Sequence, residues 1–271
     1  MDKFRKLGIN PEILKSLEEQ KIHEPTEIQE KTIELVLAGK DIIAGAATGS
    51  GKTLAFGTGI IQNSDKCGMI QALVLVPTRE LADQVAKSLK LFSKYKHLSI
   101  IEIFGGVSMG PQVDNLRIAD VVVATPGRML DHIGRETVNL NNVKMLILDE
   151  ADRMLDMGFI EDVKKIIRAC PQKRQTMLFS ATISHEIRRI SDKYMNSPVE
   201  IMAETQVDPS KLKQVFYDVP DNMKFSLLVH LLRQEKKGSV MVFCNTQRNT
   251  DFVTKNLQSL GINALAIHGG Y

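Results

Sequence analysis

The chain has 271 residues, of which 43% are hydrophobic and 25% are charged, enough to bury one large core or two of ordinary size. Its net charge of +3 is compatible with nucleic-acid binding but does not argue for it. The three cysteines lie far apart and the six histidines show no zinc-ligand spacing, which argues against a disulfide framework and a zinc site. The N-terminus, MDKFRK, is too charged for a signal peptide, and no apolar run approaches the length of a membrane span. We therefore expect a globular protein in the reducing cytoplasm.

The N-terminal part of the chain predicts two helices joined by a turn. Apolar residues recur at helical spacing through residues 1–24, and Pro11 follows Asn10 as a first helical residue follows its N-cap. The sequence PTEIQ at residues 25–29 then opens a second helix. Taken alone, Gln29 is expected to be an exposed helix residue rather than a ligand.

Residues 46–53 read AATGSGKT, between an apolar run at 41–44 that is typical of a strand and residues 54–61, which can continue as a helix. A strand, a Gly-rich turn and a helix opening on Lys-Thr form the arrangement that cradles a polyphosphate. The Lys52 ammonium can reach the β- and γ-phosphates, and the Thr53 hydroxyl is suited to Mg²⁺, although the strict pattern has glycine where Ala46 stands. We predict that the nucleotide is bound by Ala47, Thr48, Gly49, Ser50, Gly51, Lys52 and Thr53.

Further apolar runs along the chain each end in a polar or glycine-containing cluster. They cover residues 72–76, 99–104, 121–124, 145–148 and 175–179. Runs of Leu, Ile and Val are typical of strands buried on both faces, and amphipathic helices separate them. Strands alternating with helices predict an α/β fold with a doubly wound parallel sheet, in which ligands bind beyond the carboxyl ends of the strands. The clusters should therefore gather at one edge of the sheet.

Two acidic residues, Asp149 and Glu150, close one of these apolar runs. Mg²⁺ bound to a nucleotide needs an oxygen ligand, often through water, and Asp149 is placed to supply it. Glu150 could orient and deprotonate an attacking water as a general base. The alternative is that the two residues only cap the following helix; the phosphate loop upstream favours the functional interpretation.

The character of the sequence changes after Pro198. The segment AETQVDPS at 203–210 is typical of an interdomain linker. A second alternation then predicts strands at 214–219, 240–244 and 264–268 and helices at 223–234 and 249–260. Because about 60 residues are few for a doubly wound domain, we expect the second domain to be partial. The predicted organisation is a first domain at 1–203, a linker at 204–211 and a partial second domain at 212–271.

Several motifs occur together in the order and spacing of a known family. They are PTEIQ at 25–29, AATGSGKT at 46–53, PTREL at 77–81, GG at 105–106, TPGR at 125–128, DEAD at 149–152 and SAT at 180–182. With them, the chain resembles the DEAD-box RNA helicases over essentially its whole length, and VMVFCNT at 240–246 and HGG at 268–270 resemble segments of the family's second domain. The resemblance implies RecA-like domains, ATP with Mg²⁺ as cofactors, and RNA as the partner.

The resemblance also implies an adenine-recognition segment. Gln29, helped by Thr26 and by Phe4, which lies 25 residues earlier, would read the adenine edge, since an amide can make two hydrogen bonds to adenine. Ile22 occupies the part of this segment where the family usually has an aromatic residue, so we expect weaker stacking on the base.

The remaining motifs are implied to act in catalysis, coupling and RNA binding. Lys52, Asp149 and Glu150 keep the roles argued above, while Ser180 and Thr182 would hydrogen-bond the acidic cluster and couple it to the interdomain geometry. Helix N-termini, glycine amides and arginines suit contacts to a sugar–phosphate backbone. Such contacts are implied for Pro77, Thr78, Arg79, Gly105, Gly106, Thr125, Pro126, Gly127 and Arg128.

The activity implied by the resemblance is RNA-stimulated ATP hydrolysis coupled to local duplex unwinding or remodelling of RNA–protein complexes. The family's TDxxxRGxD-like and HRxGR-like segments, whose arginines reach the γ-phosphate, do not occur in these 271 residues. Because such an arginine is worth about 10³–10⁵ in rate in related phosphoryl transfers, we expect this chain alone to bind ATP weakly, hydrolyse it poorly and not unwind RNA. The alternatives are a non-catalytic RNA- or partner-binding fragment and a P-loop ATPase that acts on DNA.

Overall fold

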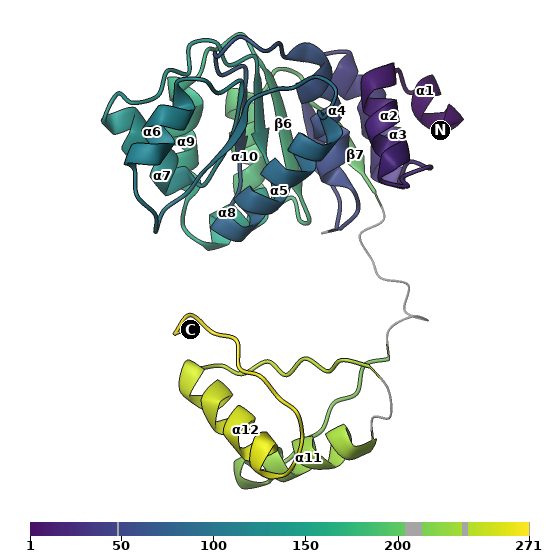
Figure 1. Ribbon diagram of the computed structural model, residues 1–271, viewed down its shortest axis with the longest axis vertical. Coiled ribbons are helices and arrows are strands. Elements are labelled where there is room, and N and C mark those ends of the chain that lie inside the picture. Colours follow the sequence, from purple (N-terminus) through teal and green to yellow (C-terminus); the bar gives the residue numbers. More distant parts are fainter. Residues whose placement is uncertain (48, 204–212, 235–237, 271) are drawn as a thin grey trace. The chain divides into compact units, whose positions relative to one another are not determined.

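The computed structural model describes residues 1–47, 49–203, 213–234 and 238–270 (Figure 1). The chain divides into two compact units, Met1–Val207 and Asp208–Tyr271. The linker predicted at 204–211 lies outside the described residues, so the proposed domain boundaries stay a prediction. Each unit is described by itself below.

The first unit is built on a parallel sheet of seven strands in the order β3-β4-β2-β5-β6-β1-β7. The strands are β1 (Ile42–Gly45), β2 (Ala72–Leu75), β3 (Ile100–Ile103), β4 (Val121–Ala124), β5 (Met145–Leu148), β6 (Gln175–Ser180) and β7 (Val199–Met202). Each run predicted as a strand from residue 41 to residue 179 is confirmed, with ends that shift by at most one residue. The predicted doubly wound parallel sheet is therefore confirmed.

Two layers of helices cover the two faces of this sheet (Figure 1). The buried side chains of one face pack with α1 (Asp2–Lys6), α2 (Pro11–Glu19), α3 (Glu27–Leu37), α4 (Lys52–Asn63) and α5 (Arg79–Phe92). Those of the other face pack with α6 (Gly110–Leu116), α7 (Pro126–Gly134), α8 (Ala151–Asp156), α9 (Ile160–Ala169) and α10 (His185–Tyr194). The strand pleat explains the division, because Ile42 and Ala44 face the first core while Ile43 between them faces the second.

Helix starts follow the capping signals in the sequence. The Asn10 side chain accepts a hydrogen bond from the Ile13 N–H at 3.0 Å, with Pro11 as the first residue of α2. The Thr78 hydroxyl accepts from the Leu81 N–H at 3.2 Å at the start of α5. The predicted Asn10 cap is confirmed, and the Thr78 cap fixes where the chain turns after β2.

The edge strand β7 was not predicted from the sequence. It pairs with β1 through residues 199–202, and only Ile201 of its side chains is buried. This strand has one neighbour and a single buried side chain, so it lacks the continuous apolar run that marks the central strands. Its sequence carries no local strand signal, because β7 is defined by its pairing with residues 157 positions earlier in the chain.

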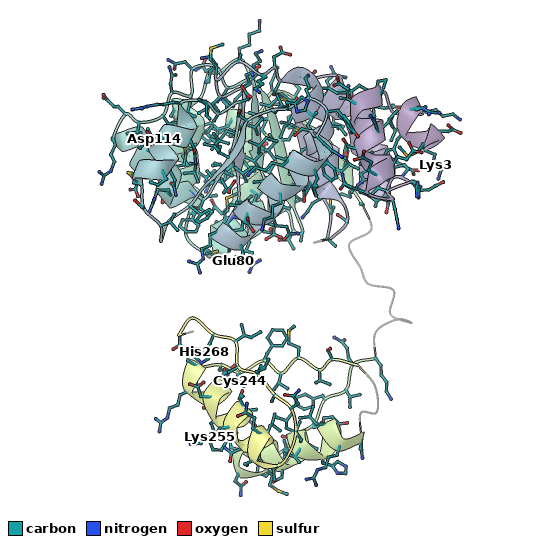
Figure 2. The ribbon with its side chains drawn as sticks, in the orientation of Figure 1. Lys3, Glu80, Asp114, Cys244, Lys255 and His268 are labelled. Carbon is teal, nitrogen blue, oxygen red and sulfur yellow. The ribbon has the colours of Figure 1, made fainter. Side chains whose placement is uncertain are left out.

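The second unit contains α11 (Lys224–Gln234) and α12 (Gln247–Ser259), close to the two helices predicted there. The strands predicted at 214–219, 240–244 and 264–268 are wrong for this structure, since the described residues of this unit contain no assigned strand. Apolar side chains in those segments stay exposed, including Phe216, Phe243 and Ile267. Two helices cannot cover both faces of a parallel sheet. The three predicted strands therefore have no apolar core that would stabilise their pairing. Figure 2 shows Cys244 on one of these extended segments.

None of the helices in the described part of the chain is both long and apolar enough to cross a membrane.

Candidate functional site

The motifs of the first unit gather at one edge of the sheet, as predicted. All strands are parallel, so the segments that follow them begin at the same edge. The strand order places the loop after β1 beside Ser180 at the end of β6 and Asp149 directly after β5. The clusters after β2, β4 and β3 continue along the same edge in that order. The predicted nucleotide motifs thus occupy one half of the edge and the predicted RNA motifs the other half.

The phosphate loop depends on glycines at two positions. Gly49 and Gly51 have φ of +80° and +94°, in the left-handed region that other residues adopt at a cost. Gly51 is the N-cap of α4, so Lys52 and Thr53 are the first two residues of that helix. The Ala46 N–H also donates to the Ser180 carbonyl at 2.9 Å, which joins the loop to the end of β6. Thr48, one of the predicted loop ligands, lies outside the described residues.

Gln29 and Thr26 bind the phosphate loop directly. The Gln29 amide donates to the Gly51 carbonyl at 3.0 Å, and its Oε1 accepts from the Thr26 N–H at 3.0 Å. The Thr26 hydroxyl donates to the Ser50 carbonyl at 2.7 Å. Gln29 is therefore buried rather than exposed as its helix pattern alone predicts, and the structure joins the PTEIQ segment to the loop.

The other residues assigned to adenine recognition lie in or against the apolar core. Phe4 on α1 is fully buried, and Ile22 is half-buried and packs against the same core cluster. A fully buried ring offers no surface to a ligand in this arrangement. The effect of Phe4 on a nucleotide would have to pass through the position of α1 and the segments packed on it.

The most strongly perturbed carboxylate of the site is Asp149, which is 3% exposed at the end of β5. Burial raises the pKa of Asp149 to about 6, and the Lys52 charge, with Nζ 3.9 Å from Oδ1, offsets this only in part. Lys52 is itself buried and donates to the Ala46 carbonyl at 3.3 Å. Positive charge brought to this place would stabilise the Asp149 carboxylate.

Glu150 adopts a backbone conformation that is uncommon for a glutamate. Its φ of +50° and ψ of +51° lie in the left-handed region, where a non-glycine residue carries strain of about 1–3 kcal/mol. Its carboxylate is mostly buried and lies 3.3 Å from the Arg153 guanidinium. Strain of this kind clusters at functional sites, and it turns the chain sharply between β5 and α8.

Ser180 and Thr182 hydrogen-bond the second aspartate of the DEAD sequence. The Thr182 N–H and hydroxyl both donate to Asp152 Oδ2, at 2.9 Å and 3.1 Å. The Ser180 hydroxyl accepts from the Asp152 N–H at 3.1 Å and donates to the Thr182 carbonyl at 2.8 Å. Burial works to raise the pKa of Asp152, but these hydrogen bonds outweigh it and hold the pKa below its usual value. Asp152 is thus a site residue that the sequence signalled only as part of DEAD.

In the other half of the edge, Arg79 lies against the glycine pair. A Cβ on Gly106 would lie 3.5 Å from Arg79 Nη1, and Gly106 has φ of +83°. Arg79 is exposed, as is Glu80, which accepts a hydrogen bond from its guanidinium at 2.7 Å and lies at the periphery of the unit in Figure 2. An exposed pair of this kind is worth little, so Arg79 can exchange this partner for a phosphate.

Arg128 has a different environment from Arg79. Its side chain is 12% exposed, and Nη1 and Nη2 each donate to the Val107 carbonyl at 3.1 Å. Thr125 is the N-cap residue of α7, and Pro126 and Gly127 are its first two residues. Nothing lies within 4 Å of a Cβ placed on Gly127. The structure brings the TPGR residues to the edge, but it turns the arginine inward onto the glycine turn.

A magnesium site at this edge would depend on ligands from the nucleotide. The described residues hold no group of three or more His, Cys, Asp or Glu side chains placed to bind a metal ion. Mg²⁺ keeps several waters and uses one or two carboxylates together with phosphate oxygens, which fits the Asp149 carboxylate and the Thr53 hydroxyl. The raised pKa of Asp149 agrees with this fit, because its buried carboxylate lacks full compensation.

Replacing Gly51 by alanine should lower the free energy of unfolding by about 3 kcal/mol. The left-handed backbone costs a residue with a Cβ about 1–2 kcal/mol, and the added carbon would overlap Gln29 Nε2 and lie 3.1 Å from Thr26 Oγ1. Both side chains would lose hydrogen bonds to the loop, each worth about 1 kcal/mol. Urea unfolding followed by circular dichroism measures the loss.

Gly49→Ala is the matched control for this experiment. Gly49 has a similar φ of +80°, but nothing lies within 4 Å of its Cβ position. We expect a loss of about 1 kcal/mol from the backbone alone. Equal losses in the two variants would contradict the close approach of Gln29 and Thr26 to the loop.

The chain is similar to named RNA helicases along nearly its whole length. It is 43% identical over 273 residues to ATP-dependent RNA helicase CshA of Listeria monocytogenes, an alignment that covers 99% of this chain and 52% of that protein. It is 42% identical over 267 residues to the probable ATP-dependent RNA helicase MJ0669 of Methanocaldococcus jannaschii, covering 98% of this chain and 72% of that protein. The chain spans about half the length of the CshA relatives it matches.

Solved structures give the same relationship. The crystal structure of a DEAD box protein from the hyperthermophile Methanococcus jannaschii matches with a TM-score of 0.73 and 42% identity, covering 99% of this chain and 73% of that one. A hypothetical ATP-dependent RNA helicase from Sulfolobus tokodaii matches with a TM-score of 0.68 and 36% identity over 91% of this chain and 72% of that one. The sequence profile of the DEAD/DEAH box helicases matches residues 26–190, which include the phosphate loop, DEAD and SAT. With its motifs in this order along one sheet edge, the chain belongs to the DEAD/DEAH box helicase family.

Proposed function

We propose that this chain carries the ATP-binding half and part of the RNA-binding surface of an ATP-dependent RNA helicase. The observation that carries the proposal is the strand order, which sets the predicted nucleotide residues beside one another after β1, β6 and β5. The same order continues into the predicted RNA residues after β2, β4 and β3. Relatives that match nearly the whole chain are named ATP-dependent RNA helicases, which supports the proposal.

In the nucleotide half, the chain supplies charge and a base. Lys52 would leave the Ala46 carbonyl and the Asp149 region to bind β- and γ-phosphate oxygens. Asp149 and Thr53 would hold Mg²⁺, which when bound neutralises phosphate charge and orients the phosphate chain. Glu150, one residue after Asp149, would accept the proton of the attacking water. For Gln29, we propose contacts to the adenine edge made in exchange for its present hydrogen bond to the Gly51 carbonyl.

In the other half, we propose sequence-independent contacts to the RNA backbone. The backbone amides of the exposed Gly105 and Gly106 and of the half-buried Gly127, with the N-termini of α5 and α7, suit phosphate oxygens. Arg79, exposed beside Gly106, would supply the positive charge. Thr182 donates two hydrogen bonds to the Asp152 carboxylate, and the Ser180 hydroxyl accepts one from the Asp152 N–H. We propose that nucleotide and RNA occupancy are coupled through this link between the acidic loop and the end of β6.

For the 271 residues alone, we propose slow ATP turnover and no unwinding. The sequence contains neither of the later segments whose arginines complete the site in the family that the chain resembles. One such arginine accounts for about 10³–10⁵ in rate in related phosphoryl transfers. The cytoplasmic location expected from the sequence also stays a prediction.

The test is ATP turnover by the purified chain with and without single-stranded RNA, compared with Glu150→Gln. We expect slow turnover that RNA raises and that Glu150→Gln lowers by about 10²–10⁴, the usual worth of a general base, while Mg²⁺–ATP binding is kept. Glu161→Gln, an exposed carboxylate on α9, is the control and should leave turnover unchanged.

Other outcomes separate the alternatives. RNA binding that is insensitive to ATP, with no turnover at all, would favour a non-catalytic binding fragment. Equal stimulation by single-stranded DNA would favour an ATPase that acts on DNA. Robust unwinding by the 271 residues would contradict the proposed need for the later arginines.

A further inference from the structure

A buried glutamine lies beneath the turn that contains Gly105 and Gly106. Gln112 on α6 is 6% exposed, and its Nε2 donates to the Phe104 carbonyl at 3.0 Å. Its Oε1 lies 3.4 Å from Arg128 Nη1 and 3.1 Å from Nε2 of the fully buried His132, both on α7. One side chain thus connects the end of β3 with two residues of α7.

The hydrogen-bonding chemistry fixes the orientation of this amide. An Arg128 guanidinium can only donate, so the Gln112 atom facing it must be the oxygen. His132 Nε2, which faces the same oxygen, must then carry a proton, and its Nδ1 accepts from the Thr137 hydroxyl at 2.8 Å. Burial, and next the Arg128 charge, hold the pKa of His132 below its usual value, which agrees with a neutral ring in this tautomer.

The two ends of the glycine turn are held from below by this cluster. Gln112 binds the carbonyl of Phe104, directly before Gly105, and Arg128 binds the carbonyl of Val107, directly after Gly106. Gly105 and Gly106 themselves are exposed. The position of the turn relative to the N-terminus of α7 therefore depends on the side chains of Gln112 and Arg128.

We propose that Gln112 and His132 are positioning residues for RNA-backbone binding, holding Arg128 and the glycine turn at the spacing that successive phosphates require. The inference rests on the proposed RNA-binding function and extends it to two residues that no motif includes. According to this proposal, Arg128 holds the glycine turn in place through its hydrogen bonds to the Val107 carbonyl, and the phosphate contacts come from backbone amides and from Arg79.

Burying a polar cluster costs free energy, since each polar group loses its hydration and must then find a hydrogen-bond partner inside the protein. An apolar residue on α6 would fill the same space at lower cost but would remove the side-chain donor to the Phe104 carbonyl and one of the acceptors that the Arg128 guanidinium has beside the Val107 carbonyl. Three groups converge on one glutamine here. Phe104 directly precedes one segment implied to bind RNA, Arg128 belongs to another, and His132 lies four residues after Arg128 on the same helix. Such convergence is the arrangement that locks a binding surface in one conformation.

The experiment compares Gln112→Met with Gln175→Met in the full chain. Gln175 is a buried glutamine that also donates to backbone carbonyls, those of Val36 and Lys40, but it lies at the amino end of β6. Affinity for a fluorescein-labelled oligouridine RNA should fall about tenfold in Gln112→Met and less than twofold in Gln175→Met, since one lost polar contact is worth about a factor of ten. Affinity for Mg²⁺–ATP should not change in either variant.

Amide hydrogen exchange without RNA gives a second readout. Exchange at Gly105, Gly106 and Val107 should accelerate in Gln112→Met and stay unchanged in Gln175→Met. Equal RNA affinities in the two variants would overturn the inference and leave the proposed function intact. If the unaltered chain does not bind the RNA while exchange at the turn still accelerates in Gln112→Met, the proposed RNA-binding function is wrong, and only the role of Gln112 in holding the glycine turn is supported.

Gln112→Glu keeps the test decisive if the methionine variant does not fold. A glutamate retains an oxygen acceptor for Arg128 and His132 but loses the N–H that binds the Phe104 carbonyl. It should bind RNA more tightly than Gln112→Met wherever both fold, and its exchange at Gly105 should still exceed that of the unaltered chain. Slow exchange at Gly105 in Gln112→Glu would overturn the inference.

Discussion

Replacing Lys52 by alanine should weaken binding of Mg²⁺–ATP by about 100-fold. A charge-assisted hydrogen bond from a buried ammonium to phosphate is worth about 1.5–3 kcal/mol, and each 1.4 kcal/mol is a tenfold change in affinity. Lys52 is suited to this contact because it opens α4, directly after the phosphate loop, and is 6% exposed. Isothermal titration calorimetry of the full chain measures the change.

Lys40→Ala is the matched control, because it removes the same charge at the other end of β1. Lys40 is exposed and lies two residues before the first residue of that strand. We expect its affinity for Mg²⁺–ATP to stay within about twofold of the unaltered chain, since an exposed charge beyond the Debye length is screened by salt. If the two variants bind equally well, the phosphate loop is not the nucleotide site.

Lys52 also stabilises the structure without a ligand. Its Nζ is 3.9 Å from the Asp149 carboxylate and 3.3 Å from the Ala46 carbonyl, so the ammonium is partnered when no ligand is bound. A cation shared between a buried aspartate and an incoming phosphate makes binding an exchange of partners rather than the burial of a bare charge. The remaining free-energy cost would be the loss of the Lys52–Asp149 interaction if Lys52 binds a nucleotide instead.

The sheet and its motif-bearing edge were predictable from the sequence because their signals are local. Continuous apolar runs mark the central strands, and Pro11 and Thr78 mark helix starts by chemistry confined to a few residues. Parallel strands then place their carboxyl ends together, so the neighbourhood of Ser180, Asp149 and the phosphate loop follows from topology. The structure confirms each of these expectations.

What the sequence did not predict depends on contacts between distant segments. No local pattern indicates that Gln29 donates to Gly51, that Arg128 turns inward onto Val107, or that Gln112 joins α6 to α7. A helical pattern alone assigns a glutamine or an arginine to the solvent face, because it contains no information about which carbonyls lie opposite. These residues become recognisable only when the tertiary structure brings their partners within hydrogen-bond distance.

In the described part of the second unit, local signals predicted strands that the structure does not contain. Its apolar runs have the composition of buried strands, yet Phe243 stays 88% exposed and no strand is assigned among its described residues. Strand propensity measures how well a side chain fits a half-buried pleated surface, so it is not expressed where no such surface forms. The helices, whose hydrogen bonds close within the segment, formed close to where they were predicted.

Replacing Asp149 by asparagine should change the stability of the chain in a way that depends on pH. Asp149 has a pKa of about 6 in the folded chain and a reference value of 3.8, so the folded state holds its proton more tightly. The stabilisation that this proton provides is fully present below the reference value and is lost as the pH rises through about 6. Asparagine cannot titrate, so the free energy of unfolding of the variant relative to the unaltered chain should rise by about 1.4 kcal/mol from about pH 5 to about pH 7.5.

Comparing the difference in unfolding free energy at two pH values cancels every effect of the substitution that does not depend on pH. Asp149→Asn also takes a partner from Lys52, but the pH-dependent part of that loss is already contained in the pKa of Asp149, so only a part that does not change with pH remains. Urea unfolding of both proteins at the two pH values, followed by circular dichroism, gives the four free energies required. A difference that is independent of pH would contradict the raised pKa of Asp149.

Asp152→Asn is the control of opposite sign on the same loop. Hydrogen bonds from Ser180 and Thr182 hold the pKa of Asp152 below its usual value despite partial burial. A lowered pKa contributes stability above the reference value that is lost as the pH falls, so this variant should lose more stability at neutral pH than in acid. The pKa values of the two aspartates in this four-residue motif would then be shifted in opposite directions, because the Asp149 carboxylate is buried with too few compensating partners and the Asp152 carboxylate accepts several hydrogen bonds. That contrast would identify Asp149 as the carboxylate whose charge a bound cation stabilises most.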